Sequence, residues 1–534
     1  MERLLSAFFS PDVAERAGCL EKSGPQDPLV TGLEYDSRRV KPGDLYFALR
    51  GLHTDGHRHI GQAIERGAVV IVHEDETIDE TIDETVDEAI KGEAGALYLR
   101  VRNSRVAMSP IAAAFYGYPS QRMACIGVTG TEGKSTTVYL IWQLLILTGK
   151  KAGFFSTVLS SVGGDARPNP EHQTTPEATE VQRLLWEMAE NGAEYAVVEA
   201  SSHGLSPKTN RLGDVEFAAA VMTNVTHEHL EFHGTWEQYR DDKANLFRAL
   251  RRQGVLSRFG VINADDPSGP SFAAAAANAK ILKFSVRGLA ADLSLGSITS
   301  DAEGNWYNVV VQRTGEIIDI RDRLPGAFNA ANVLAALLVV SELLNVPVQE
   351  LTPLAARLRP LKGRMTKIPN TMGIELLVDY AHTPSSFQTI FPPLRERLDR
   401  AAPAGKGRLI CVFGSAGERD TKKRPLQGTI AASYADTIIL CDEDPRGEDP
   451  MIILEEIAAG CLKGNPGLRR GRDLFLIPNR PTAIRQALFL AERGDLVLLL
   501  GKGHENSIIY ADGPHPYDEI EEAEQAVAEL WNTP

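Results

Sequence analysis

A glycine-rich loop between a predicted strand and a predicted helix is the strongest chemical signal in the sequence. Residues 125–128 are a short apolar run typical of a buried strand, and residues 138–145 carry apolar side chains at helical spacing. The loop between them reads Gly130-Thr-Glu-Gly-Lys-Ser-Thr136. Glycines let backbone N–H groups close on phosphate oxygens, and a helix start adds partial positive charge. Lys134 is therefore predicted to reach the terminal phosphates of a nucleotide, and Ser135 to offer its hydroxyl to Mg²⁺.

The generic phosphate-loop pattern has glycine at a position where this chain has Val128. The alternative is a glycine turn that only precedes a core helix. Gly-Lys-Ser opening a helix directly after a strand favours phosphate binding over that alternative.

Acids and histidines further along the chain are candidates for holding the metal. Glu199 ends an apolar run and precedes Ser-Ser-His203, which predicts a strand-end carboxylate that binds Mg²⁺; an exposed strand-end charge is the alternative. Residues 226–233 hold three histidines, so a zinc site competes with one histidine helping a second Mg²⁺. Lys243, judged by composition alone, is a surface lysine.

Bulk composition limits the class of protein. The 534 residues exceed one hydrophobic core and suggest about three domains. A net charge of −15 argues against binding to nucleic acid or to a membrane surface. Much of that charge lies in a Thr-Ile-Asp-Glu repeat at 74–88, predicted to be a solvated surface insertion, helical with Ile78, Ile82 and Val86 inward.

An odd number of cysteines, five in all, no basic-then-apolar N-terminal pattern and no run long enough for a membrane span together predict a cytoplasmic protein. The cysteines lie mostly in apolar runs and show no paired metal spacing, which indicates buried thiols.

Strand and helix patterns divide the chain at about residues 122 and 358 and indicate an α/β fold. Residues 1–122 form a small α/β domain that ends in a linker at Tyr118-Pro-Ser. Residues 123–358 hold the phosphate loop, apolar strands near 194–200, 218–223 and 261–264, a hairpin in 305–320 and a long Ala/Leu helix after residue 332. The hydrophobic spacing of residues 359–534 indicates a third domain.

The third domain has the clearest architecture, because short apolar runs alternate with helical segments as in a parallel sheet. Four of its predicted strands run into polar sequences that begin at Asp379, Gly414, Asp442 and Gly501. Ligands bind at the carboxyl ends of such strands, so these sequences are predicted to form a site. The predicted strands are 376–378, 409–413, 437–440, 474–477 and 496–500.

An ordered set of motifs resembles the Mur ligase family, and within it the members that make the UDP-N-acetylmuramoyl tripeptide. The resemblance covers nearly the whole chain, including Asp36-Ser-Arg-Arg in the first domain. Its motifs are Gly130–Thr136, Thr174-Thr-Pro176, Glu199-Ala-Ser-Ser-His203, Thr223-Asn224, His229-Leu-Glu-Phe-His-Gly234, Gly326-Ala-Phe-Asn-Ala-Ala-Asn332, Asp379-Tyr-Ala-His-Thr-Pro384 and Gly501-Lys-Gly-His-Glu505.

The resemblance implies a UDP-binding N-terminal domain, a central P-loop ATPase-like domain and a Rossmann-like C-terminal domain. It implies an ATP-dependent amide ligase of peptidoglycan precursor synthesis. Such an enzyme joins a diamino acid, meso-diaminopimelate, L-lysine or L-ornithine, to UDP-MurNAc-L-Ala-D-Glu through an acyl phosphate. Its partners would be these small molecules and ATP with two Mg²⁺ ions, and we expect a monomer.

The resemblance also implies roles for individual residues. Lys134, Glu199, His229 and a carbamylated Lys243 would be catalytic, and Ser135, Glu199, His229 and that carbamate would hold metal. ATP would contact Gly130, Thr131, Gly133, Lys134, Ser135, Thr136, Asn332, Arg364 and Asp379. The UDP-muramoyl dipeptide would contact Ser37, Thr174, Thr175, Ser201 and Arg211, and the amino acid would contact Arg419, Asp444, Arg446, Gly501 and Glu505, with Glu505 taking the distal ammonium.

Departures from the family pattern leave the amino acid open. Glu132 stands where the family loop has Asn, and Asp444 stands where diaminopimelate enzymes have Asn beside the arginine, here Arg446. Arg446 favours a distal carboxylate on the substrate, whereas Asp444 favours a simple cation such as lysine or ornithine. Two further functions stay open: another ligase of the superfamily, such as folylpolyglutamate synthetase, and a nucleotide-binding scaffold with a degenerate site.

Overall fold

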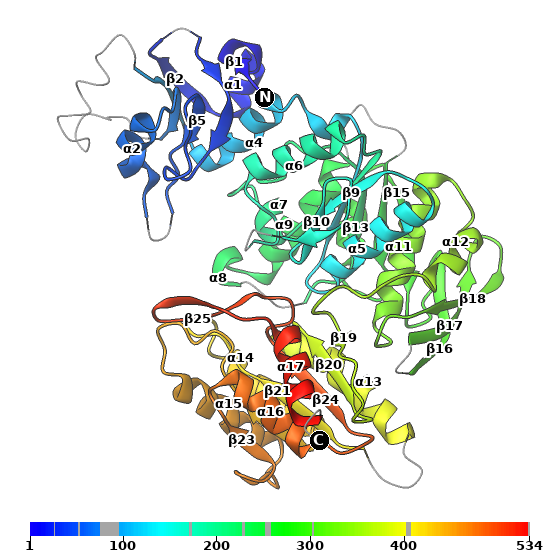
Figure 1. The fold of residues 1–534 in the computed structure, drawn as a ribbon. Coiled ribbons are helices and arrows are strands. Elements are labelled where there is room, and N and C mark those ends of the chain that lie inside the picture. The colour runs from blue at the N-terminus through cyan, green and yellow to red at the C-terminus, as the bar shows by residue number, and fades with distance from the viewer. Residues whose placement is uncertain are drawn as a thin grey trace. The chain divides into compact units, whose positions relative to one another are not determined.

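The computed structural model describes two compact units, residues 1–283 and residues 284–534 (Figure 1). The described residues are 1–25, 27–51, 54–74, 95–169, 173–226, 230–250, 258–301, 304–401 and 407–531. Nearly all of the predicted acidic helix at 74–88 falls outside them. Within those ranges no helix is both long and apolar enough to cross a membrane.

The N-terminal part of unit 1 is a five-stranded sheet in the order β2-β7-β6-β5-β4, with β4 to β7 parallel. Leu45 and Phe47 of β5 face a core that includes helix α4, whereas the alternate residue Tyr46 faces α2. The elements are β1 (Arg3–Leu4), η1 (Leu5–Ala7), α1 (Pro11–Arg16), β2 (Cys19–Ser23), β3 (Leu29–Val30), β4 (Gly32–Glu34), β5 (Asp44–Phe47), η2 (Gly56–His59), α2 (Ile60–Glu65), β6 (Val70–His73), β7 (Leu97–Val101) and α4 (Ser104–Phe115).

The segment predicted as a linker is a packed turn. Pro119 and Ser120 are buried in the short 3-10 helix η3 (Pro119–Gln121), and the Ser120 hydroxyl accepts a hydrogen bond from the backbone of Glu216 at 3.1 Å. A loop anchored in this way has little of the freedom that a linker needs.

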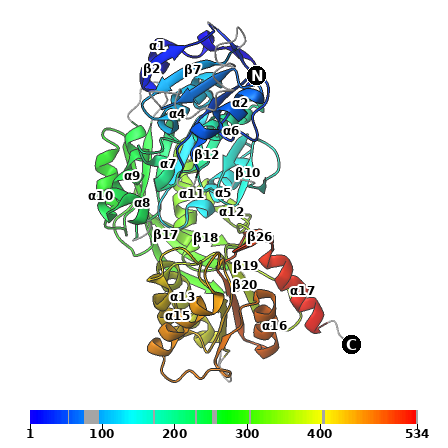
Figure 2. The same cartoon turned by 90° about the vertical axis from the view of Figure 1, so that its left-hand side faces the viewer.

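The second part of unit 1 is a sheet in the order β11-β10-β9-β12-β8-β13-β14, whose last five strands are parallel. Helices lie on both faces, with α5 on one side and α9 and α10 on the other (Figure 2). The elements are β8 (Ala124–Thr129), α5 (Lys134–Leu147), β9 (Ala152–Phe155), β10 (Leu159–Ser161), β11 (Arg167–Pro168), α6 (Ala178–Glu190), β12 (Tyr195–Glu199), α7 (Ser202–Leu205), β13 (Phe217–Met222), α8 (Leu230–His233), α9 (Trp236–Ala249), β14 (Phe259–Asn263) and α10 (Gly269–Ala275).

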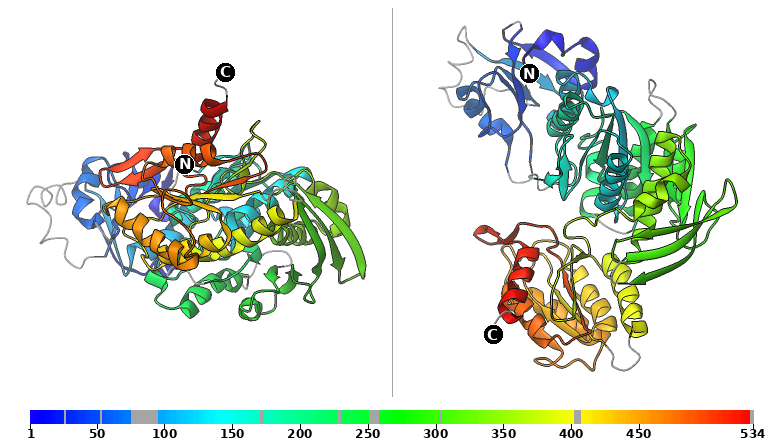
Figure 3. Two further views of the ribbon diagram at one scale, coloured as in Figure 1. Left: turned by 90° about the horizontal axis from the view of Figure 1, so that it is seen from below. Right: turned by 45° about the vertical axis from the view of Figure 1, so that its right-hand side comes forward.

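Unit 2 begins with antiparallel strands β16 to β18, drawn in green in Figure 3, followed by two helices. Strand β15 lies at the division between the units and pairs with β16 through residues of unit 2. The elements are β15 (Lys280–Ser285), β16 (Leu293–Asp301), β17 (Gly304–Val311), β18 (Glu316–Asp322), α11 (Asn329–Leu344) and α12 (Val348–Ala355).

The rest of unit 2 is a six-stranded sheet in the order β19-β20-β24-β21-β22-β23, parallel except for β19. Apolar cores on its two faces include α13 to α15 on one side and α16 and α17 on the other. The elements are β19 (Thr366–Lys367), β20 (Glu375–Asp379), α13 (Pro384–Ala401), β21 (Leu409–Phe413), α14 (Lys423–Tyr434), β22 (Thr437–Leu440), α15 (Pro450–Gly464), β23 (Leu474–Leu476), α16 (Arg480–Leu490), β24 (Leu496–Leu500), β25 (Ser507–Tyr510), β26 (Gly513–Pro516) and α17 (Glu519–Trp531).

The α/β class predicted from the sequence is confirmed, and the predicted parallel strands appear within one or two residues of their expected places. The division points at residues 122 and 358 stay predictions.

A buried ion pair joins two strand ends of the six-stranded sheet. Arg480, fully buried at the start of α16, pairs with the equally buried Glu519 at 2.5 Å. The same guanidinium donates to the carbonyl oxygens of Leu500 at 2.7 Å and Asp442 at 3.1 Å, at the ends of β24 and β22. It thereby fixes the two loops that follow those strands.

Replacing Glu519 with Gln should lower the free energy of unfolding of unit 2 by about 3–5 kcal/mol, because it leaves a buried guanidinium without its counter-charge. Denaturant unfolding followed by hydrogen exchange at the β24 amides measures the loss. Glu455→Gln is the matched control: its pair with Arg470 is half exposed, so its loss should be under about 1 kcal/mol. Equal losses in the two variants would contradict the structural role of the buried pair.

Candidate active site

Three parallel strands bring the predicted metal and phosphate residues to one edge of the sheet in unit 1. Glu199 pairs with Val128, the residue that precedes Thr129 at the end of β8, and Thr129 pairs with Met222 of β13. The phosphate loop, Glu199 and the loop after β13 therefore lie next to one another at the carboxyl ends of these strands.

The phosphate loop requires its first glycine. Gly130 has a φ of +150°, and a Cβ there would lie 1.9 Å from the Thr223 hydroxyl. That hydroxyl donates to the carbonyl of Glu132 at 2.6 Å, and the Glu132 N–H donates to the side chain of Asn224 at 2.9 Å. Residues 223 and 224 thus hold the loop backbone, a role that their presence among the sequence motifs did not reveal.

Glu199 is buried and hydrogen-bonded, so the alternative of an exposed strand-end charge is wrong. Glu199 is only 1% exposed. One oxygen accepts from the Ser135 hydroxyl at 3.0 Å, and the other accepts from the backbone and hydroxyl of Thr157 at 2.8 and 3.1 Å. A carboxylate and a hydroxyl side by side at a phosphate loop are the hard oxygen donors that Mg²⁺ takes, so these residues fit the ion.

His229, which was predicted to help hold a second Mg²⁺, lies outside the described residues. Residues 227 and 228, from the stretch considered as a zinc site, lie outside them as well. Among the residues that the structure does describe, no three His, Cys, Asp or Glu side chains are grouped as a metal site. The zinc interpretation has no support from this part of the chain.

Lys243 is not a surface lysine. Its residue is 1% exposed, and its Nζ donates to the carbonyl of Gly130 at 2.5 Å and lies 4.5 Å from the centre of the Tyr239 ring. Helix α9 therefore delivers a buried amine directly to the phosphate loop. Its carbamylation stays a prediction.

One cavity of about 280 Å³ joins the phosphate loop to the predicted substrate residues of unit 1. Lys134 and Lys243 line it together with four residues that the resemblance assigned to the UDP-muramoyl dipeptide. Ser37 is not among the lining residues, and its hydroxyl donates to Gln62 at 2.7 Å. The cavity is lined by Lys134, Gln173, Thr174, Thr175, Ser201, Ser202, His203, Arg211, Tyr239 and Lys243.

Arg211 is held at this cavity by two hydrogen bonds, to the carbonyl of Thr175 at 2.7 Å and to the carboxylate of Glu177 at 2.8 Å. Glu177 is buried and also pairs with Arg105 of helix α4. Two guanidinium groups on one carboxylate leave a net positive charge, which suits an anionic substrate.

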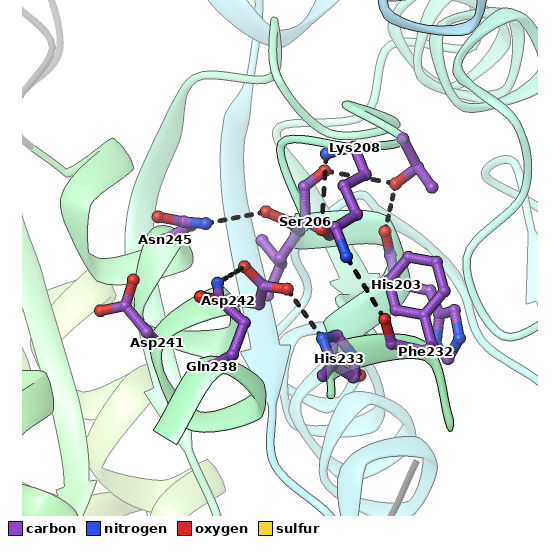
Figure 4. A network of polar contacts seen from close by, with 12 residues as sticks. His203, Ser206, Lys208, Phe232, His233, Gln238, Asp241, Asp242 and Asn245 are labelled. Carbon is purple, nitrogen blue, oxygen red and sulfur yellow. Dashed lines mark hydrogen bonds and ion pairs between the residues drawn. The ribbon is translucent and has the colours of Figure 1, made fainter. Parts of the chain in front are cut away.

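A buried polar chain ties α9 to the start of α7, and Figure 4 shows its His233, Gln238 and Asp242 members. His233 contacts Asp242 at 2.7 Å through Nδ1 and the Ser202 hydroxyl at 3.0 Å through Nε2, and Gln238 donates to the second oxygen of Asp242 at 2.9 Å. Asp242 precedes Lys243, so the chain fixes the helix turn that carries this lysine. A histidine-rich stretch signalled a polar site, but not which residue each ring would meet.

Unit 2 holds three of the residues predicted to contact ATP, which are Asn332, Arg364 and Asp379. Asp379 ends β20 and accepts the N–H groups of Met365 and Ala381 at 2.7 and 2.8 Å. Burial raises the pKa of its carboxyl, and the charge of Arg364 opposes that rise. The Arg364 guanidinium lies 4.8 Å from the centre of the Tyr380 ring. Asn332, also predicted to contact ATP, donates to Asn329 on helix α11 at 2.9 Å.

A fully buried lysine links two of the residues predicted to bind the amino acid. Lys502 Nζ donates to Asp444 at 2.9 Å and to Glu505 at 2.5 Å, and the Tyr380 hydroxyl donates to the other oxygen of Glu505 at 3.0 Å. Lys502 stands inside the recognised Gly501–Glu505 motif, yet the sequence did not reveal that its ammonium faces inward.

Two arginines, Arg446 and Arg419, were also predicted to bind the amino acid. The Arg446 backbone, at a φ of +55°, donates to Ile509 at 2.9 Å, whereas Arg419 is exposed after β21. Burial, followed by the charges of Arg364 and Lys502, lowers the pKa of His504 to about 3, so this ring is neutral at physiological pH.

Comparison with known proteins decides the family. Sequence models of the Mur ligase family match three consecutive stretches: the catalytic domain at 29–116, the middle domain at 128–340 and the glutamate ligase domain at 363–503. The UDP-N-acetylmuramyl-tripeptide synthetase of Treponema denticola is 47% identical over 93% of each chain. The chain belongs to the Mur ligase family. It is an ATP-dependent ligase.

Two further Mur ligases are similar to this chain over nearly its whole length. The UDP-N-acetylmuramyl-tripeptide synthetase of Roseiflexus is 46% identical over 95% of this chain and 96% of its own. A solved UDP-N-acetylmuramoyl-L-alanyl-D-glutamate--2,6-diaminopimelate ligase superposes with a TM-score of 0.60 at 28% identity, covering 94% of this chain and 95% of that one. The three-domain Mur ligase architecture is therefore confirmed.

Replacing Gly130 with Ala should abolish nucleotide binding in this Mur ligase, because the new methyl group would displace Thr223 and the loop that it holds. Calorimetric titration with ADP and Mg²⁺ measures the effect. Gly164→Ala is the control, since a Cβ there meets nothing within 4 Å. ADP affinity equal to that of the control would show that the loop does not depend on this glycine.

Proposed function

We propose that this Mur ligase adds a diamino acid to UDP-MurNAc-L-Ala-D-Glu at the expense of ATP. The observation that carries the proposal is a cavity in unit 1 that the phosphate-loop Lys134 shares with Thr174, Thr175, Ser201 and Arg211. A phosphate donor and a carboxylate acceptor held in one cavity can react in line. The tripeptide-synthetase names of the relatives at 46–47% identity support the same substrate.

Phosphoryl transfer needs positioning and charge neutralisation more than a protein nucleophile. Lys134 would face the terminal phosphates, and Arg211, held by Glu177, would hold the anionic substrate. Ser135 and Glu199 would hold Mg²⁺, which when bound neutralises phosphate charge.

The reaction balances in two steps. The D-glutamate carboxylate oxygen bonds to the γ-phosphorus while the bond to ADP breaks, which gives an acyl phosphate. The neutral amine of the incoming amino acid then attacks the acyl carbon, and inorganic phosphate leaves as the amide forms and the amine proton is lost.

Asp444 does not by itself exclude a substrate with a distal carboxylate, because Lys502 already neutralises it at 2.9 Å. The names of the relatives do not decide the amino acid either, since the tripeptide synthetases name none and the solved structure names 2,6-diaminopimelate. We therefore place meso-diaminopimelate, L-lysine and L-ornithine together as the candidate class.

Purified protein given ATP, Mg²⁺, bicarbonate and UDP-MurNAc-L-Ala-D-Glu should release phosphate only when one of these three amino acids is added. Phosphate release and mass spectrometry of the product measure turnover. Reactions without the UDP substrate are the control. Absence of product with all three amino acids would reject the proposed function, and turnover with folate instead would favour folylpolyglutamate synthesis.

Lys243→Ala should lower kcat by at least about 100-fold, because it removes a buried group that contacts the phosphate loop. If the group is a carbamate, added formate or acetate should restore part of the activity, since a small carboxylate can replace it. Lys208→Ala is the control, because that lysine is exposed and its Nζ donates to the carbonyl of Phe232. Unchanged turnover in Lys243→Ala would reject a catalytic role.

A further inference from the structure

Ser202, His233 and Asp242 form a buried line of hydrogen bonds that begins at the cavity of unit 1. His233 Nδ1 lies 2.7 Å from a carboxylate oxygen of Asp242, and its Nε2 lies 3.0 Å from the Ser202 hydroxyl. None of the three residues is more than 5% exposed. Of the three, Ser202 lines the cavity. A hydroxyl, an imidazole and a carboxylate in this order can move a proton from a cavity wall to a buried ring.

The hydrogen-bond partners decide where the hydrogens of this line lie. Gln238 donates to the other oxygen of Asp242 at 2.9 Å. An ionised carboxylate only accepts hydrogen bonds, so His233 Nδ1 donates to Asp242. A neutral imidazole carries one N–H, so Nε2 is the acceptor and takes the hydroxyl hydrogen of Ser202. Ser202 therefore faces the cavity with the lone pairs of its oxygen and not with its hydrogen.

An acceptor at this position suits one of the three reactants. The triphosphate and the carboxylate offer mainly acceptor oxygens, whereas the amine of the incoming amino acid offers N–H groups. The preceding residue, Ser201, is predicted to contact the UDP-muramoyl dipeptide that the amine attacks. Its N–H donates to Thr175 at 2.9 Å, and its hydroxyl accepts from Gly204 at 3.1 Å, so the backbone that carries Ser202 is fixed.

We propose that Ser202 and His233 take the proton that the amine loses when the amide bond forms. This inference rests on the proposed function and concerns its second step alone. The amine nitrogen bonds to the acyl carbon, one N–H proton passes to Ser202 Oγ, and the hydroxyl proton passes to His233 Nε2. The resulting imidazolium faces the carboxylate of Asp242.

The cycle closes when phosphate leaves. The bond from the acyl carbon to the phosphate oxygen breaks, and the proton returns from His233 through Ser202 to that departing oxygen. Both side chains end as they began, and no further reactant is needed. Ser202 is the catalytic residue that touches the amine, and Asp242 is a positioning residue that keeps Nε2 of His233 ready to accept.

Asp242→Asn tests the relay because it can keep each hydrogen bond and still reverse the histidine. The new amide oxygen can accept from Gln238 while its N–H donates to His233 Nδ1, which places the ring hydrogen on Nε2. We expect the rate of amide formation to fall about 100-fold or more, the usual contribution of a general base. The rate of acyl-phosphate formation should not change.

Single-turnover rapid quench measures the two rates separately. The reaction contains ATP, Mg²⁺, bicarbonate, UDP-MurNAc-L-Ala-D-Glu and the amino acid that the wild type accepts. ADP reports the first step, and mass spectrometry of the tripeptide product reports the second. Equal slowing of both steps in Asp242→Asn would assign these side chains a structural role alone and overturn the inference, as would an unchanged rate of amide formation.

Asn245→Ala is the matched control. Asn245 also joins α9 to α7, since its side chain donates to the carbonyl of Leu205 at 3.0 Å, and it has no part in the relay (Figure 4). Both rates should stay close to those of the wild type. If the wild type joins no amino acid at all, the proposed function fails instead, so the two failures are distinguishable.

Ser202→Ala provides a second variant should Asp242→Asn fold poorly. It removes the oxygen that faces the cavity and leaves His233 paired with Asp242. ADP should again form rapidly in the first turnover, while an acyl phosphate accumulates that borohydride reduces to an alcohol. Amide formation at the wild-type rate in this variant would contradict proton transfer through Ser202.

Discussion

Parallel pairing of β12, β8 and β13 is the constraint on which the site of unit 1 depends. The register sets Glu199 beside Val128 and Thr129 beside Met222, so three loops leave the sheet together. The residues predicted to bind phosphate and metal, and the residues that support the loop, then come from different stretches of sequence at the carboxyl ends of these strands. A one-residue slip of β12 would turn Glu199 to the other face of the sheet and away from Ser135.

Helix α9 adds what the sheet edge lacks, a buried amine. Lys243 reaches the carbonyl of Gly130, and the hydrogen-bonded chain through Asp242, His233 and Ser202 fixes the turn of the helix that carries it. The lysine is buried beside the predicted phosphate loop, and its burial is supported by specific partners rather than by apolar packing alone. The same partners explain why a lysine on a largely polar helix does not face water.

Unit 2 uses internal cations in a comparable way. Arg480 joins the ends of β22 and β24, and Lys502 joins the loops that follow them. Arg480 pairs with one acid, Glu519, whereas Lys502 pairs with two, Asp444 and Glu505.

The sequence by itself determined the α/β class, the parallel strands, the phosphate loop and the family, because strand and helix periodicity and the spacing of Gly, Lys and Ser are local properties. Only the tertiary structure decided the burial of Lys243, the inward position of Glu199, the Thr223–Asn224 support of the loop and the pairing of Lys502 with Asp444 and Glu505. Apart from Lys502 with Glu505, the contacts cited join residues 58 to 113 positions apart, and composition carries no information on which side chain will meet which. Packing of the sheet and its covering helices settles that choice, since it decides which charges lose water and must find a partner.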